Sequence, residues 1–101
     1  MFKDLVKSRK NKVFLKNNSP KFFNVIILND NFTTMEFVVK VLIMFFNLSV
    51  KQATTLMLNI HNNGSAIVGT YTKDLAETLV IKVNNYSRQN NFPLKSIMSP
   101  K

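Results

Sequence analysis

Short apolar runs separated by polar residues divide the chain after residue 21 into six segments. Residues 22–28, FFNVIIL, form a short run rich in β-branched and aromatic residues, which predicts a buried strand. Residues 65–71 and 94–98 predict two further strands. The last of the three helical segments has an apolar face with helical spacing, made by Leu75, Leu79, Val83 and Tyr86.

Capping residues predict where the first helix begins and ends. Thr33 and Glu36 match the S/T-x-x-E capping box, with Thr33 as the N-cap of a helix over about residues 34–46. Asn47 then suits the left-handed conformation in which many helices end.

The other two helices carry similar signals. Ser49 and Gln52 form a second capping box, which opens a helix that stops near residues 63–64. Thr72 can cap the third helix. Asp74 lies in its first turn, where the helix dipole favours an acidic side chain.

The resulting order, β-α-α-β-α-β, predicts an α/β (α+β) sandwich in which a small three-stranded antiparallel sheet packs on three helices. Residues 22–101 are expected to form one domain, because single domains commonly hold about 100–150 residues. Residues 1–21 are polar and basic, show no sustained period and end near Pro20. They are therefore expected to be a flexible N-terminal extension.

Much of the net charge of +9 lies in one stretch. Residues 1–21 hold seven of the fourteen basic residues and one of the five acids, or +6 of the total. This suggests an alternative function as a small basic nucleic-acid-binding domain. The stretch has only Phe2 and Phe14 as aromatic residues, however, and no stacking motif of the RNP1 kind. The longest apolar run, residues 37–46, is far below the roughly 18 residues of a membrane span. Neither nucleic acid nor a membrane is therefore expected as a partner.

Residue types that support catalysis or metal binding are scarce. The chain has no Cys, one His and five acidic residues, and Gly64 and Gly69 are its two glycines. Neither the P-loop nor the glycine-rich dinucleotide motif is present, and one His with scattered acids does not predict a metal site. We therefore expect that the protein is not an enzyme and uses no cofactor.

The polar residues directly after the first strand allow two interpretations. Asn29, Asp30 and Asn31 are typical of a turn, because such side chains hydrogen-bond their own backbone. They also collect acceptors for a positively charged group. His61 is either a surface residue favoured by a helix C-terminus or a polar group at the rim of an apolar pocket. Met35 is either ordinary core or part of an adaptable pocket wall.

Several segments, taken in order, resemble the Clp protease adaptor family, ClpS. They are NDNFTTMEFVVKVLIMFFNLS, ATTLMLNIHNNGSAIVG, TKDLAET and NNFPL, within residues 22–98. The resemblance implies an adaptor of the N-end rule (N-degron) pathway, which binds proteins with a free N-terminal Leu, Phe, Tyr or Trp and delivers them to a AAA+ Clp unfoldase. The implied partner is the N-terminal domain of a ClpA- or ClpC-type unfoldase. A monomer in the bacterial cytoplasm is expected, with the plastid stroma as the alternative location.

The resemblance also implies roles for individual residues. The amine of the substrate would be bound by Asn29, Asp30 and His61. The hydrophobic pocket would be formed by Met35, as the gating residue, with Val38, Met57, Ile60 and Leu94. The acidic contact with the unfoldase would be Asp74, and residues 1–21 would engage the unfoldase during handover.

Three positions depart from the family pattern: Asn31 replaces an acid, Thr34 replaces a proline and Leu79 replaces a basic residue. Proline at the first helical position is replaceable, because the N–H there is unpaired in any case. Asp30 itself is expected to be an exposed loop carboxylate with little structural role.

Overall fold

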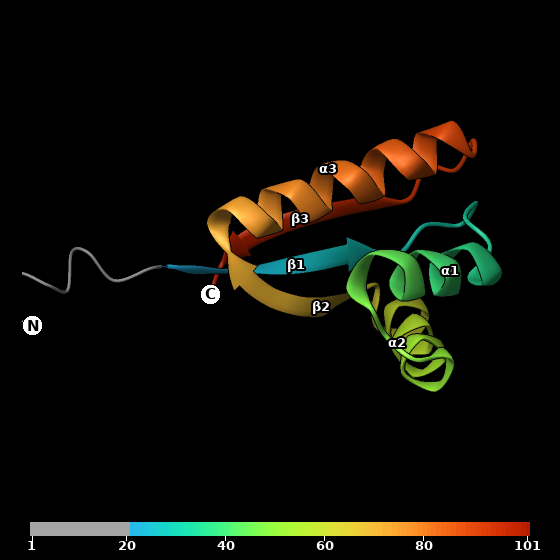
Figure 1. Cartoon of the computed structure of the whole chain (residues 1–101). Coiled ribbons are helices and arrows are strands. Elements are labelled where there is room, and N and C mark those ends of the chain that lie inside the picture. Colours follow the sequence, from blue (N-terminus) through green and yellow to red (C-terminus); the bar gives the residue numbers. More distant parts are fainter. Residues whose placement is uncertain (1–20) are drawn as a thin grey trace, which may run out of the picture.

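A computed structural model describes residues 21–101 of the chain (Figure 1). Its elements are β1 (Phe22–Leu28), α1 (Met35–Phe46), α2 (Val50–Asn63), β2 (Ser65–Thr72), α3 (Lys73–Gln89) and β3 (Lys95–Pro100). This is the predicted β-α-α-β-α-β order, and the fold class is confirmed. Residues 1–20, which hold all but the last residue of the predicted extension, lie outside the described part.

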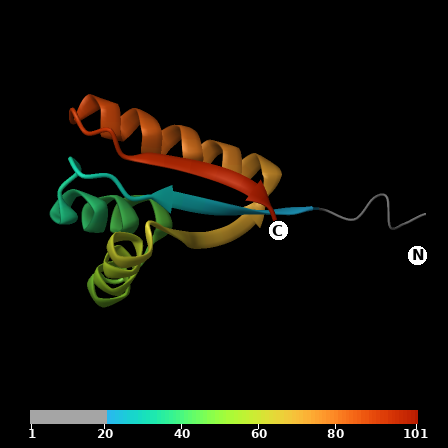
Figure 2. The same cartoon turned by 180° about the vertical axis from the view of Figure 1, so that it is seen from behind.

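β1 is the central strand of an antiparallel sheet with the order β2-β1-β3, as both views show (Figures 1 and 2). Successive residues of a strand point to opposite faces of the sheet. Val25 and Ile27 are fully buried in the core, whereas Ile26 between them is only partly buried. The sheet therefore has one face covered by helices and one face that is more open.

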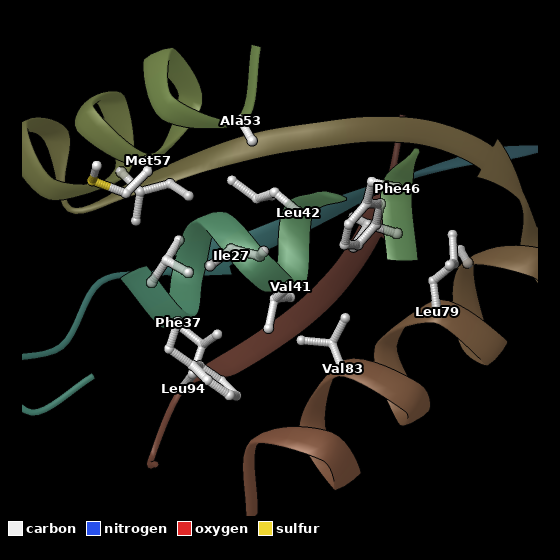
Figure 3. Close-up of a cluster of buried hydrophobic side chains, with 14 residues drawn as sticks. Ile27, Phe37, Val41, Leu42, Phe46, Ala53, Met57, Leu79, Val83 and Leu94 are labelled. Atoms are coloured by element: carbon white, nitrogen blue, oxygen red, sulfur yellow. The ribbon is translucent and has the colours of Figure 1, made fainter. Parts of the chain in front are cut away.

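The core lies between the sheet and the helices (Figure 3). Val41 and Leu42 of α1 and Val83 of α3 are fully buried, and Figure 3 shows them converging with Ile27 of β1. Aromatic rings extend this cluster, since Phe37 stacks on Tyr86 with ring centroids 5.5 Å apart. These contacts hold α1 against α3, and they fix the first turn of α1 in space.

The buried face of α3 differs in two residues from the predicted face, because Ala76 replaces Leu75 and Ser87 replaces Tyr86, which is only partly buried. Leu79 and Val83 are buried as expected, but Leu75 is 47% exposed and Ala76 takes its place in the core. Ala76, Leu79, Val83 and Ser87 are spaced by three, four and four residues, which is the spacing of one helical stripe. The buried Ser87 hydroxyl donates to the carbonyl of Val83 at 2.8 Å, so its polar group is satisfied.

β3 starts one residue later than predicted and ends two residues later. It is tied to α3 by Asn84, whose Oδ1 accepts from the backbone N of Ser96 at 2.8 Å and from its Oγ at 3.1 Å. The Asn84 amide also donates to the Ser96 carbonyl at 3.2 Å. Because β3 is an edge strand, this helix side chain makes hydrogen bonds that a further strand would otherwise make.

Candidate functional site

The loop that follows β1 is organised by the carboxylate of Asp30. Its Oδ1 accepts from the backbone N of Phe32 at 2.8 Å and of Thr33 at 2.7 Å. Its Oδ2 accepts from the Thr33 hydroxyl at 2.7 Å. The expectation that Asp30 has little structural role is therefore wrong, because this side chain fixes the backbone of the loop.

The N-cap of α1 is Thr34 and not Thr33, which corrects the predicted capping box. Thr34 has extended backbone angles, φ −72° and ψ 151°, and its hydroxyl accepts from the backbone N of Phe37 at 3.1 Å. The Thr33 side chain instead turns toward Asp30, to which its hydroxyl and its N–H both donate. The φ of Thr34 is close to the value of about −65° that a proline ring imposes, so the backbone here suits either residue.

The second part of the site is the C-terminal end of α2. This helix begins with the predicted capping box of Ser49 and Gln52, and it ends at Gly64, whose φ of 89° is left-handed. The carbonyl of Gly64 accepts a hydrogen bond from the backbone N of Asn29 at 2.9 Å. This bond joins the loop after β1 to the last turn of α2, where the exposed His61 lies.

A cavity of about 180 Å³ lies where these two segments meet. It is lined by Asn29, Asp30, Asn31, Thr33, Met35, Val38, Met57, Ile60 and His61. Val38, Met57 and Ile60 are buried and form an apolar floor, whereas Met35 is 46% exposed at the mouth. This one cavity therefore has both polar acceptors and an apolar floor.

The structure brings together all the predicted amine-binding and pocket residues except Leu94. Leu94 is 1% exposed and belongs to the core. In Figure 3 it lies below α1, near Phe37, while Met57 lies above that helix. Asn31 and Thr33 also line the cavity, although the family resemblance gave neither residue a binding role and Thr33 was expected only as a helix cap. Their position between Asp30 and Met35 was the signal that could have identified them.

Asp30 places a negative charge at this cavity at neutral pH. Burial alone would raise the pKa of its carboxyl group, but the hydrogen bonds from Thr33 and Phe32 and the nearby charge of Arg88 outweigh burial. The pKa therefore lies below the ordinary 3.8 of an aspartate. Arg88 is itself held in place, because its Nη1 donates to the carbonyls of Phe92 and Leu94, both at 2.9 Å.

The predicted unfoldase contact lies at the other end of the sheet. Asp74 is exposed in the first turn of α3, directly after β2. The end of β2 pairs with the start of β1, through Thr72 and Phe22, whereas the cavity follows the last residue of β1. Figure 1 shows the start of α3 beside the C-terminus and the beginning of β1. Leu79 is buried and offers little surface for a contact of its own.

A wider hollow of about 460 Å³ between α2 and β2 has Lys51 as its charged lining residue and contains no carboxylate. Within residues 21–101, no three His, Asp or Glu side chains are grouped so as to hold a metal ion. None of the helices described for this chain has the length and apolar character needed to cross a membrane.

Comparison with known proteins identifies relatives over most of the chain. Residues 18–97 match the family described as ATP-dependent Clp protease adaptor protein ClpS. The chain is similar to bacterial proteins named ATP-dependent Clp protease adapter protein ClpS. The protein of Desulforapulum autotrophicum is 47% identical over 87 residues, which are 86% of this chain and 84% of the relative. The protein of Acetivibrio thermocellus is 41% identical over 98 residues, which are 97% of this chain and 96% of the relative.

A solved structure has the same fold. It is Agrobacterium tumefaciens ClpS2 bound to L-phenylalaninamide, which is 34% identical and superposes with a TM-score of 0.80. The match covers 82% of this chain and 100% of the other. The ligand of that relative is a phenylalanine derivative with a free amine and an apolar side chain.

Proposed function

We propose, from the premise that this chain belongs to the ClpS family of ATP-dependent Clp protease adaptors, that its cavity binds the free N-terminal residue of a substrate protein. In this proposal the adaptor serves the N-end rule pathway, takes N-terminal Leu, Phe, Tyr or Trp and delivers the protein to a AAA+ unfoldase. It does so as a binding protein without catalysis of its own. The observation that carries the proposal is the union of an ionised acid and an apolar floor in one cavity.

The polar side of the cavity suits an ammonium group. A free N-terminus has three N–H donors, whereas an internal residue has one. Asp30 supplies the charge. Three of its roughly four acceptor positions are used within the loop, which leaves about one for the ligand. We assign the other two acceptors to the Asn29 side-chain oxygen and to a ring nitrogen of His61. Hydrogen bonds to a charged group contribute about 1.5–3 kcal/mol each.

The apolar side suits a large hydrophobic side chain. Val38 and Ile60 are branched and buried, and Met57 is flexible enough to adapt to side chains of different shape. Burying a Leu or Phe side chain contributes about 1.5–3 kcal/mol. Together with the hydrogen bonds, and after the cost of association, this corresponds to roughly micromolar binding. Neither side of the cavity suffices alone, so the proposal requires both the amine and the side chain.

Delivery requires that the substrate and the unfoldase bind the adaptor at the same time. Asp74 and the beginning of β1 lie at one end of the sheet, and the cavity lies at the other. A seven-residue strand is about 23 Å long, which separates the two sites enough for two partners. We propose that a monomer in the bacterial cytoplasm presents Asp74 to the N-terminal domain of a ClpA- or ClpC-type unfoldase, with the substrate at the opposite end.

Peptide titration tests this function directly. A Phe-initiated peptide should bind saturably at physiological salt, and the same peptide with an acetylated N-terminus should not bind, because acetylation removes the charge and two donors. Single-stranded RNA is the comparison ligand. Tight RNA binding with a steep salt dependence, together with indifference to acetylation of the peptide, would instead support a nucleic-acid-binding domain.

A further inference from the structure

Phe32 is the most exposed large apolar side chain among residues 21–101, at 79%. It is not among the residues that pack on the core. Single exposed hydrophobic side chains are common on protein surfaces, so exposure alone indicates no function. The position of Phe32 is more informative, because its two neighbours in sequence, Asn31 and Thr33, both line the proposed amine-binding cavity.

The backbone of Phe32 is held rigidly although its ring is exposed. Its N–H donates to Oδ1 of Asp30, and the next N–H donates to the same oxygen. The ring is therefore attached to a fixed point on the rim of the cavity. A contact with such a group costs less conformational entropy than a contact with a mobile loop.

The geometry of a bound peptide brings its second residue to this rim. Consecutive Cα atoms are 3.8 Å apart, so the second residue stays close to the mouth when the first side chain fills the cavity. Successive side chains of an extended chain point to opposite sides. The second side chain therefore points away from the apolar floor, and it can touch only a group that stands out from the rim.

We infer that Phe32 forms a subsite for the second residue of the substrate and favours a planar side chain there, either an aromatic ring or the guanidinium of arginine. This inference rests on the proposed function. Aromatic pairs and cation–π pairs of this kind strengthen binding by about 2- to 10-fold. Because the Phe32 side chain makes no core contact, its removal should leave the fold and the first-residue cavity unchanged.

The test is a set of peptides that begin with Phe and carry Ala, Leu, Tyr, Arg or Glu as second residue. They are titrated against the full-length protein and the variants Phe32→Ala, Phe32→Tyr and Phe22→Ala. Phe22 is the matched control, since it is also an exposed phenylalanine, at 47%, but lies at the other end of β1. Thermal unfolding of each variant is followed in parallel.

The wild type and Phe22→Ala should bind the Tyr and Arg peptides about 2- to 10-fold more tightly than the Ala peptide. Phe32→Ala should lose this preference and keep the affinity for the Ala peptide, and Phe32→Tyr should restore it. A preference that persists in Phe32→Ala would overturn the inference, as would a wild type that binds all five peptides equally. Failure of every peptide to bind would overturn the proposed function as well.

Discussion

Replacement of Asp30 by asparagine separates the two tasks that the structure gives this residue. The carboxylate holds the loop through Oδ1 and Oδ2 and, in the proposed function, also neutralises the ammonium of the substrate. In Asp30→Asn, the remaining oxygen can still accept from the backbone N–H groups of Phe32 and Thr33. The new NH₂ group can donate to the Thr33 hydroxyl, which serves as donor or acceptor. The loop should therefore survive, while the charge is lost.

The expected loss of peptide affinity follows from that change. A hydrogen bond to a charged group contributes about 1.5–3 kcal/mol, and the new amide turns a donor toward the ammonium. We expect a loss of about 2–4 kcal/mol, which is a factor of about 30–1,000 in Kd. Asp30→Ala should lose the same affinity and also destabilise the fold by about 1–3 kcal/mol, because three donors in the loop lose their acceptor.

Binding is measured by calorimetric titration with a Phe-initiated peptide, and stability by thermal unfolding. Asp74→Asn is the matched control, since it removes the same unit of charge from an exposed site at the other end of the sheet. Peptide affinity should be unchanged in this control. The reasoning is refuted if Asp30→Asn binds within twofold of the wild type, or if Asp74→Asn weakens binding as much as Asp30→Asn does.

The other predictions concern pH, selectivity, stability and delivery. The pKa of Asp30 is lower in the folded protein than in the unfolded chain. The contribution of its carboxylate to folding stability is therefore complete above pH 3.8 and is lost only as the pH falls through the lower folded-state pKa. The affinity ratio of wild type to Asp30→Asn should therefore stay constant from pH 7 to pH 5, and a marked fall in this range would contradict the assignment. In the proposed function Met35 crowds β-branched side chains at the mouth, so Met35→Ala should admit N-terminal Ile and Val while retaining Leu and Phe. Unchanged selectivity in a binding panel would make Met35 an ordinary wall residue. Asn84→Ala should lower the free energy of unfolding by about 1–3 kcal/mol, since the backbone of Ser96 loses its side-chain partner, whereas replacement of the exposed neighbour in Asn85→Ala should change it little. Deletion of residues 1–21 should spare peptide affinity, because the residues that line the cavity begin at Asn29, but it should slow degradation of a Leu-initiated protein by the reconstituted protease. Equal degradation rates would leave the extension without a role in handover.

The elements that the sequence predicted well are those whose boundaries are set by neighbouring residues. β1 has the predicted bounds because its apolar run stops abruptly at Asn29. The capping box of Ser49 and Gln52 is confirmed, since both residues lie within one turn and have no competing partner. Asn47 likewise ends α1 with a left-handed φ of 57°, as predicted.

The errors have a common origin in competition between nearby groups. Thr33 has the right spacing to Glu36 for an N-cap, but its hydroxyl donates to Oδ2 of Asp30, and Thr34 is the N-cap instead. On α3, the large side chain of Leu75 suggested burial, yet the helical stripe through Leu79 and Val83 continues to the small Ala76. A pattern of large residues shows the direction of an apolar face, and only packing against the sheet fixes its centre.

The cavity itself is a different case, because local patterns cannot predict which distant segments meet. Its two parts are joined by the hydrogen bond from the Asn29 N–H to the Gly64 carbonyl, between groups 35 positions apart in the sequence. Periodicity and capping describe each segment alone, which is why the surface and the rim interpretations of His61 both stayed open. The family resemblance spanned both segments and so implied their contact. Leu94 shows the limit of that inference. Its backbone carbonyl is fixed by Arg88, and its side chain is enclosed by the core on the side of α1 away from Met57. Any effect of Leu94 on a bound ligand would therefore be indirect, transmitted by the residues that cover it.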